Sequence, residues 1–146
     1  MSLAVSSQSK REGEVLYEIV EEVASVDDFV RLREVAGLTP RPRIAAEKGL
    51  PNSLYGVTVK LDEMIVGMGR VVGDGGLNFE IVDVAVDPEH HGRGLGRLIM
   101  EQIMGFMESS APQGAYITLM ADVPVLYEKF GFKLSRPGSE GMYKIR

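Results

Sequence analysis

The sequence predicts an α/β fold, a single domain whose mixed, mostly antiparallel, twisted sheet is flanked by about four helices. Segments with strand patterns dominate the middle of the chain, and helical patterns are inserted between them. An apolar strand that ends at Val86 leads through a glycine-rich turn directly into a helical pattern. The length of 146 residues suits one domain with a sizeable core, expected over residues 13–146, and the polar residues 1–12 are expected to be flexible.

Capping residues delimit two helices that follow a first apolar strand at residues 15–20. Ser25 and Asp28 have the spacing of a capping box, and the helix that begins there is expected to end at Gly37. A second, short helix is expected from about Pro42 to Lys48, because Gly49 follows it.

Two turns delimit the next three strands. Asp62-Glu63 joins residues 54–61 and 64–72 in a predicted hairpin. Asp74-Gly75-Gly76 then leads into an apolar strand at residues 77–86.

The second half of the chain carries two more helical patterns. The first, residues 94–108, begins at the glycine-rich turn and ends before Pro112. Asp122 is expected to cap the second, which has Pro124 in its first turn and Gly131 just past its end. Three further strands are expected to complete the sheet, at residues 115–120, 132–134 and 142–145.

Residues 91–97 form a candidate anion site. The first N–H groups of a helix have no acceptor within it, the helix dipole is positive there, and glycine lets a phosphate approach the backbone. Two common nucleotide motifs fail, because G-x-G-x-x-G needs glycine where Arg97 or Ile99 stands, and a P-loop needs a Gly-Lys pair that the chain lacks. On spacing alone, a phosphate site and a plain strand-to-helix connection stay equally open.

Composition excludes several classes of protein. The net charge of −5 argues against nonspecific nucleic-acid binding, and no apolar run is long enough to span a membrane. No secretory signal pattern stands at the start, so we expect a cytoplasmic protein. Without cysteine, and with His90 and His91 as the only histidines, thiol nucleophiles and three-histidine zinc sites are excluded, and no metal is expected.

Two segments resemble the motifs of one enzyme family. His91-Gly92-Arg93-Gly94-Leu95-Gly96 resembles the Q/R-x-x-G-x-G/A signature of the GNAT N-acetyltransferase superfamily. Leu126-Tyr127-Glu128-Lys129-Phe130-Gly131-Phe132 resembles that family's L-Y-x-K-x-G-F segment, and the two occur in the family's order. The resemblance covers roughly residues 54–135. His91 departs from the family's usual Gln or Arg, and Met120-Ala121-Asp122 stands where an Asn is usual.

The resemblance implies an acyltransferase that moves an acetyl group from acetyl-CoA directly to a primary amine, on a small molecule or a peptide. It places the CoA cleft where strand 77–86 meets helix 94–108, and it is compatible with a homodimer. The residues it implies at CoA are Val84, Ala85, Val86, His91, Gly92, Arg93, Gly94, Leu95, Gly96 and Arg97.

Acetylating an amine requires a base, because an alkylammonium with a pKa near 10.4 is nucleophilic in only about one molecule in 10³ at neutral pH. Glu80 lies on strand 77–86, and in the histone-acetylating branch of the resembled family a catalytic Glu stands at the same offset from the glycine. A solvated or ion-paired Glu80 is an equally open interpretation. Strand alternation places Asp83 on the opposite face from Glu80 and the other even positions up to Val86, and Asp83 or a water is the rival base.

Tyr127 holds the position of the tyrosine that protonates the departing thiolate in the resembled family. The alternative is a packing aromatic that shares a helical face with Val123 and Phe130.

The charged residues of the glycine-rich turn have different expected roles. Arg93 is expected to neutralise phosphate, whereas Arg97 could equally pair with Glu101 one turn further along the helix. His90 is expected to be solvated.

Acceptor recognition in the resembled family points to residues 31–55 and 136–143. Asn52 and Ser53 are candidate acceptor-binding residues, or simply part of a turn. The first segment is basic, which allows an anionic acceptor, although a solvated face is the favoured interpretation. Its arginines are Arg31, Arg33, Arg41 and Arg43.

Two other classes compete with an acetyltransferase. One is a non-catalytic acyl-CoA-binding or sensor domain of the same fold. The other is an unrelated nucleotide-binding protein, which the failed motifs weaken.

Overall fold

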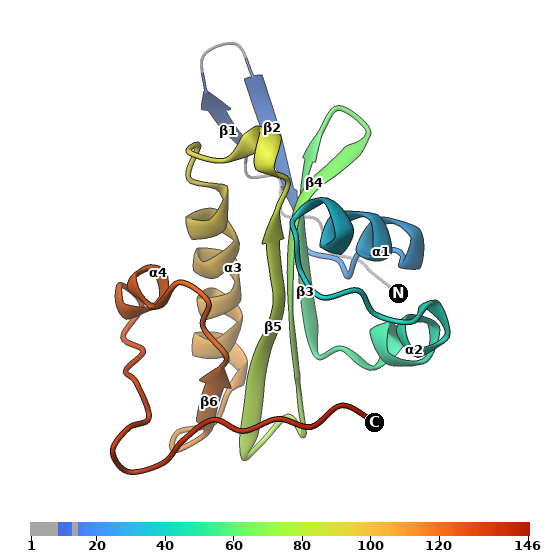
Figure 1. Ribbon diagram of the computed structural model, residues 1–146. Coiled ribbons are helices and arrows are strands. Elements are labelled where there is room, and N and C mark those ends of the chain that lie inside the picture. The colour runs from blue at the N-terminus through green and yellow to red at the C-terminus, as the bar shows by residue number, and fades with distance from the viewer. Residues whose placement is uncertain (1–8, 13–14) are drawn as a thin grey trace.

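A computed structural model describes residues 9–12 and 15–146, with side chains from residue 16 onward. Six strands of these residues form one sheet in the order of the sequence (Figure 1). Neighbouring strands are antiparallel from β1 to β5, and β5 and β6 are parallel. The strands are β1 (Ser9–Glu12), β2 (Val15–Val20), β3 (Tyr55–Leu61), β4 (Met64–Gly73), β5 (Asn78–Val86) and β6 (Tyr116–Leu119).

Helices cover both faces of the sheet: α1 and α2 lie on one side and α3 on the other (Figure 1). The predicted capping box is confirmed, because the Ser25 hydroxyl accepts a hydrogen bond from the Asp28 N–H at 3.1 Å. The helices are α1 (Val26–Val35), α2 (Arg43–Gly49), α3 (Leu95–Ser110) and α4 (Pro124–Glu128), with short 3₁₀ turns at Leu50–Asn52 and Pro88–His90.

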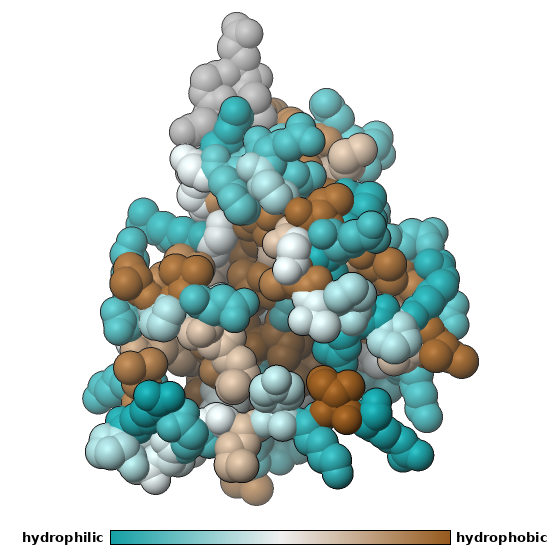
Figure 2. All heavy atoms as spheres, in the orientation of Figure 1, coloured by the Kyte–Doolittle hydropathy of each residue, from teal (hydrophilic) through white to brown (hydrophobic). Residues whose placement is uncertain are grey.

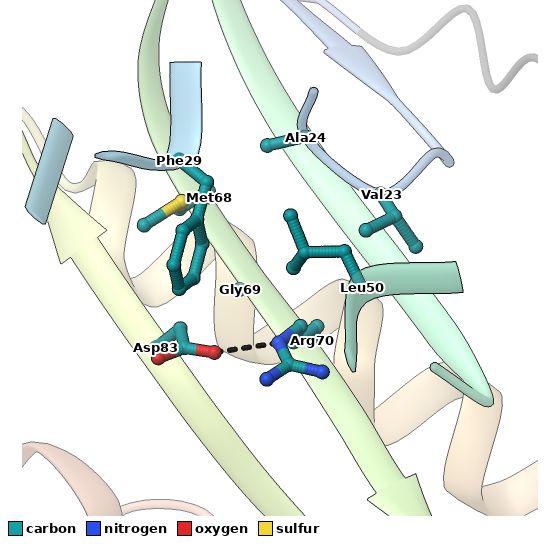
Figure 3. Close-up of a pocket in the computed structure, with 8 residues that line it drawn as sticks. All are labelled: Val23, Ala24, Phe29, Leu50, Met68, Gly69, Arg70 and Asp83. Carbon is teal, nitrogen blue, oxygen red and sulfur yellow. Dashed lines mark hydrogen bonds and ion pairs between the residues drawn. The ribbon is translucent and has the colours of Figure 1, made fainter. Parts of the chain in front are cut away.

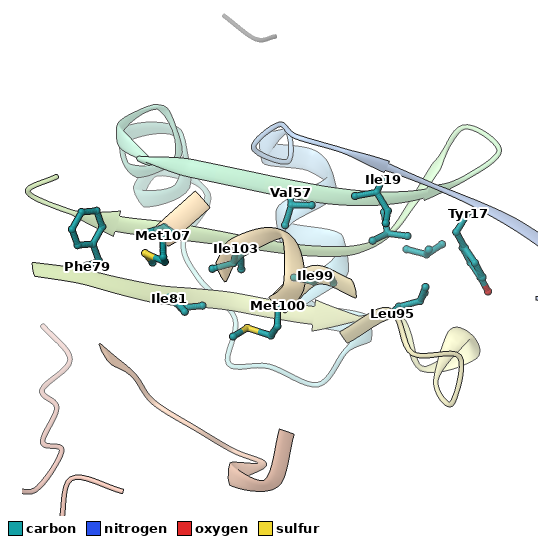
Figure 4. Packing of buried hydrophobic residues seen from close by; sticks show 13 residues of the cluster. Tyr17, Ile19, Val57, Phe79, Ile81, Leu95, Ile99, Met100, Ile103 and Met107 are labelled. Carbon is teal, nitrogen blue, oxygen red and sulfur yellow. The ribbon is translucent and has the colours of Figure 1, made fainter. Parts of the chain in front are cut away.

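The larger core lies between α3 and the sheet (Figure 4). Ile99 and Ile103 of α3 are fully buried there, against strand residues such as Ile81. Glycine in β4 lets α3 come close, since a Cβ at Gly69 would lie 2.7 Å from Ile99 Cγ2. A second core joins α1 to the other face, where Phe29 and its neighbours pack over β4 and β5. Both faces of β4 and β5 are therefore packed against helices.

Three predictions of local structure are wrong. Within the segment 1–12 that was expected to be flexible, residues 9–12 form β1 and pair with β2, and residues 1–8 lie outside the described residues. Val123, not Asp122, is the N-cap of α4, whose first residue is Pro124. Residues 132–134 and 142–145 are not strands, because apolar alternation alone does not supply the partner strand that a ladder of hydrogen bonds requires.

Two kinds of feature are absent from the residues that the structure describes. Among them, no helix is both long and apolar enough to cross a membrane. Nor do three or more His, Cys, Asp or Glu side chains of these residues gather as a metal site would require.

Candidate active site

The strands β5 and β6 part midway along β5. Their parallel ladder covers only residues 78–81 of β5, whereas β5 continues to Val86. On its other edge, β5 stays paired with β4 as far as Val86. Between Ile81 and Val86, the edge that faces away from β4 can therefore pair its backbone groups with an extended ligand.

A β-bulge interrupts β5 at this opening. The register between β4 and β5 shifts between Met68 and Arg70, and on β5 the shift falls at Asp83. Asp83 has a φ of 59°, a left-handed conformation that few non-glycine residues adopt. A bulge adds one residue to one strand, so the alternation of faces changes beyond it.

Glu80 and Asp83 consequently face the same side of the sheet, and the prediction that they face opposite sides is wrong. Phe79 and Ile81 are buried in the core under α3, so Glu80 between them faces α1 and α2. Asp83 contacts Arg33 of α1, which places its carboxylate on that same side. The extra residue of the bulge is the physical reason, and the hydrophobic pattern did not reveal it.

Asp83 is held between Arg33 and Arg70, and Figure 3 shows its ion pair with Arg70. Arg33 Nη1 donates to Asp83 Oδ1 and Arg70 Nε donates to Oδ2, each at 2.6 Å. Arg33 also donates to the Thr39 carbonyl through two nitrogens. Both carboxylate oxygens are thus engaged, so Asp83 anchors the two arginines.

Arg33 itself is buried, at 9% exposure, so the expectation of a solvated basic face is wrong for this arginine, whereas Arg41 and Arg43 are exposed as expected. Burial lowers the pKa of Arg33, and the charge of Asp83 opposes that shift. Asp83 therefore compensates the positive charge that Arg33 keeps inside the fold.

Asp83→Asn is expected to destabilise the fold by roughly 3–5 kcal/mol, because it leaves two largely buried guanidinium groups without their carboxylate. Urea unfolding gives the free energy. Asp27→Asn is the matched control, since Asp27 pairs with Arg43 on the exposed surface and should cost about 1 kcal/mol or less. Equal effects of the two variants would show that the Asp83 pair is no more than a surface contact.

The glycine-rich turn presents the N-terminus of α3. Gly92 and Gly94 have φ values of 78° and 75°, which glycine adopts without steric cost. The first bond within the helix runs from the Leu98 N–H to the Gly94 carbonyl at 3.1 Å, and no side chain caps Gly94. The three N–H groups from Leu95 to Arg97 therefore have no acceptor within the helix, as an anion site requires.

Buried Tyr17 holds two side chains of this turn. Its hydroxyl lies 2.8 Å from His90 Nδ1 and accepts a hydrogen bond from Arg93 Nη1 at 3.3 Å. The prediction of a solvated His90 is wrong, because the hydroxyl of a core residue reaches it. Arg97 pairs with Glu101 at 3.0 Å on the surface, one of the two alternatives left open for it.

Tyr127 lies in a groove of about 840 Å³ between β6, α4 and residues 130–141. Exposed apolar side chains gather over α4 at the left of this face (Figure 2). Tyr127 is half-buried and packs against the α3 core. Burial, and secondarily the negative charge of Asp122, raise the pKa of Tyr127 above its ordinary 10.0, so its hydroxyl keeps its proton at neutral pH.

The two candidate acceptor residues have different roles in the structure. Ser53 accepts a hydrogen bond from Arg70 Nη1 at 3.0 Å and donates to the Leu50 carbonyl at 2.8 Å. Asn52 is exposed and donates to the Lys48 carbonyl at 3.1 Å, which closes a turn. Only Ser53 joins the polar network around Asp83.

Sequence reasoning missed Arg70 and Tyr17. Arg70 is the only charged residue in an otherwise apolar strand, β4, and that isolation was the available signal. No comparable signal marks Tyr17, because its partners His90 and Arg93 lie far away in the sequence.

A family model described as an acetyltransferase (GNAT) domain matches residues 53–134. The chain belongs to the GNAT acetyltransferase family. It is 31% identical over 122 residues to the uncharacterized N-acetyltransferase ycf52 of Pyropia yezoensis. This match covers 80% of this chain and 69% of that protein. It is 33% identical to the chloroplastic GCN5-related N-acetyltransferase 2 of Arabidopsis thaliana, over 56% of this chain but only 32% of the relative.

Solved structures agree with this assignment. The protein SA2161 of meticillin-resistant Staphylococcus aureus is 43% identical, with a TM-score of 0.85 over 89% of this chain and 99% of that one. The GNAT family protein SP0256 of Streptococcus pneumoniae, at 23% identity and a TM-score of 0.74, shares the fold. The predicted GNAT fold and acetyltransferase class are confirmed, and members of this family use acetyl-CoA as co-substrate.

Proposed function

We propose that this acetyltransferase moves the acetyl group of acetyl-CoA directly onto a primary amine. The observation that carries the proposal is the parting of β5 and β6 beside the N-terminus of α3. An open strand edge and a set of free helical N–H groups, joined by one glycine-rich turn, suit a ligand that has both a pyrophosphate and an amide-containing arm.

The direction of the co-substrate follows from this arrangement. The pyrophosphate contacts the N–H groups of residues 95–97, beyond the end of β5. The arm runs back along the open edge of β5, where the six residues from Val86 to Ile81 span roughly 17 Å. The acetyl group then lies near Ile81, where β5 and β6 come together.

Glu80 is the proposed base. It is adjacent to Ile81, is half-buried, and forms no ion pair or side-chain hydrogen bond with the described residues. Its carboxylate is therefore free to accept the ammonium proton, directly or through a water. Asp83 is a weaker candidate, since two arginines engage its oxygens.

Tyr127 is the proposed acid. Collapse of the tetrahedral intermediate breaks the carbon–sulfur bond, and the departing thiolate takes a proton from a nearby donor. The Tyr127 hydroxyl is such a donor, because its raised pKa keeps it protonated. Without cysteine the chain can form no thiol-linked acyl-enzyme, which favours direct attack by the amine.

Two measurements test this function. Calorimetric titration should detect acetyl-CoA and CoA binding with no comparable binding of ATP. A panel of primary amines assayed for free thiol should contain members that release CoA together with acetylated product. Binding without turnover on any amine would instead favour a non-catalytic acyl-CoA sensor.

Glu80→Gln is expected to lower kcat/KM about 10²–10⁴-fold near neutral pH and to recover at high pH, where the free amine is abundant. The measurement is kcat/KM against pH for both proteins on one competent amine. Glu18→Gln, an exposed strand glutamate on β2, is the matched control and should follow the wild type. A Glu80→Gln profile parallel to wild type at every pH would remove Glu80 as the base.

A further inference from the structure

We propose that the acceptor is an amine that also carries an anionic group, a carboxylate or a phosphate, and that Arg70 binds this group. The inference rests on the proposed function, and it adds the chemical class of the acceptor. It starts from one feature of the sheet, a guanidinium and a carboxylate that share a face beside the opening and do not pair with each other.

Arg70 and Glu80 are diagonal neighbours on adjacent strands. Arg70 pairs with Val82 and Val72 pairs with Glu80, in a stretch of regular register. Residues opposite each other in an antiparallel pair share a face, so Arg70, Val82 and Glu80 all face α1 and α2. Diagonal positions of this kind have α-carbons roughly 7–8 Å apart, a separation that a small molecule with two charged groups can bridge.

The hydrogen bonds of the Arg70 guanidinium go to Asp83 and Ser53, not to Glu80. Arg70 Nε donates to Asp83, and Arg70 Nη1 donates to the Ser53 hydroxyl. The third nitrogen, Nη2, has no partner among the described residues. Since every buried polar side-chain atom described has a partner, Nη2 must be reachable from solvent. Arg70 is thus fixed in place with one donor group left for a ligand.

The charge around Arg70 favours an anion. Two guanidinium groups, of Arg33 and Arg70, share the single carboxylate of Asp83, so these three side chains together carry one excess positive charge. Arg41 is exposed and lies close enough for its positive charge to lower the pKa of Arg33. The centre of the Phe29 ring lies 5.8 Å from the guanidinium carbon of Arg33 and 6.0 Å from that of Arg70, so the ring covers part of each group and strengthens their attraction for an anion.

The two charges together select a zwitterion. The ammonium of the acceptor lies toward Glu80, which takes its proton, and the anionic group accepts hydrogen bonds from Arg70 Nη2. An amine without that group leaves the Nη2 donor unpaired, so we expect it to bind at least about 10-fold more weakly.

The test measures binding to the protein saturated with CoA, by calorimetry, with matched pairs of amines. L-phenylalanine against phenethylamine removes a carboxylate, and O-phosphoethanolamine against ethanolamine removes a phosphate. At least one anionic member should bind about 10-fold or more tightly than its neutral partner, and the pair that shows it identifies the anion. Equal binding within both pairs would overturn the proposal.

Variants assign the preference to Arg70. Arg70→Gln should abolish it, whereas Arg43→Gln, which removes a charge from the exposed surface of α2, should retain it. Should Arg70→Gln unfold, Arg41→Gln provides the second arm, because this exposed side chain has no ion pair among the described residues. It should reduce the preference about 2–3-fold without changing Tm. A preference unaffected by any of these arginines contradicts the proposal.

Measuring binding separately from turnover distinguishes the proposed transfer reaction from the proposed anionic acceptor. Binding to the CoA complex is measured without turnover, so a protein that binds anionic amines but acetylates none would contradict the proposed transfer reaction alone. A protein that acetylates neutral and anionic amines equally well, with Arg70→Gln like wild type, would contradict the anionic acceptor and leave the transfer reaction standing.

Discussion

Gly96→Ala is expected to weaken CoA binding about 100-fold or more while leaving the fold at least as stable as the wild type. Gly96 is the second residue of α3, with its N–H free for a phosphate. A Cβ there would meet no protein atom closer than Leu126 Cδ2 at 3.8 Å, an ordinary contact. Alanine also favours a helix by roughly 0.5–1 kcal/mol over glycine. The added methyl therefore obstructs only the ligand, and calorimetry with CoA measures the loss.

Two companion variants make this result specific. Gly105→Ala, in the same helix with nothing within 4 Å of its would-be Cβ, should bind CoA normally. Gly94→Val should abolish binding, but its φ of 75° is strained for valine, so about 1–3 kcal/mol of stability should be lost as well. If Gly96→Ala and Gly105→Ala bind CoA equally, the pyrophosphate does not contact the start of α3.

The elements that the sequence predicted well are those with local signals. The Ser25 cap, the turn at Asp62-Glu63 and the helix end near Gly37 each depend on residues within a few positions of one another. The apolar periodicity of α3 is equally local, and Leu95, Ile99 and Ile103 of that pattern are buried. The residues that cause each of these features lie close together in the sequence, so the features can be predicted from it.

The errors at the candidate site share the opposite property, because each depends on a contact between distant segments. A bulge in the pairing of β5 with β4 changes the face of the sheet on which the Asp83 side chain lies. The Asp83 carboxylate accepts a hydrogen bond from Arg33, which lies fifty positions earlier in the sequence. His90 is held by Tyr17, which lies 73 positions away. The periodicity of hydrophobic residues does not predict these contacts. A basic helix with one buried arginine also has the same sequence pattern as a basic helix whose arginines are all exposed to solvent.

The candidate site divides in the same way. The glycine-rich turn and Tyr127 stand in motifs and could be named from the sequence, whereas the polar network behind β5 could not. Arg70 is separated from its partners Ser53 and Asp83 by 17 and 13 positions and belongs to no motif. In this fold the features expected to bind the donor are local in sequence, and those expected to bind the acceptor are assembled by the sheet.

Tyr127→Phe is expected to lower kcat by roughly 10–10³-fold with little change in CoA affinity, as for loss of a general acid. The substitution removes one hydroxyl and keeps the ring, so the packing of Tyr127 against the α3 core is retained. Single-turnover rates on one competent amine, with CoA binding measured separately, give both quantities. Tyr143→Phe, at an exposed position of the C-terminal segment, is the control and should leave kcat unchanged.

The pH dependence adds a second test of the same residue. Burial and Asp122 raise the pKa of Tyr127 above 10.0, so the acid form persists through neutral pH and is lost only as the pH rises past that value. An alkaline fall in kcat caused by Tyr127 should therefore begin above about pH 10 in the wild type, and Tyr127→Phe should lack it. Asp122→Asn removes the smaller of the two causes and should move the fall to lower pH. A wild-type kcat that Tyr127→Phe leaves unchanged would make Tyr127 a packing residue, and the proton for the thiolate would then come from water.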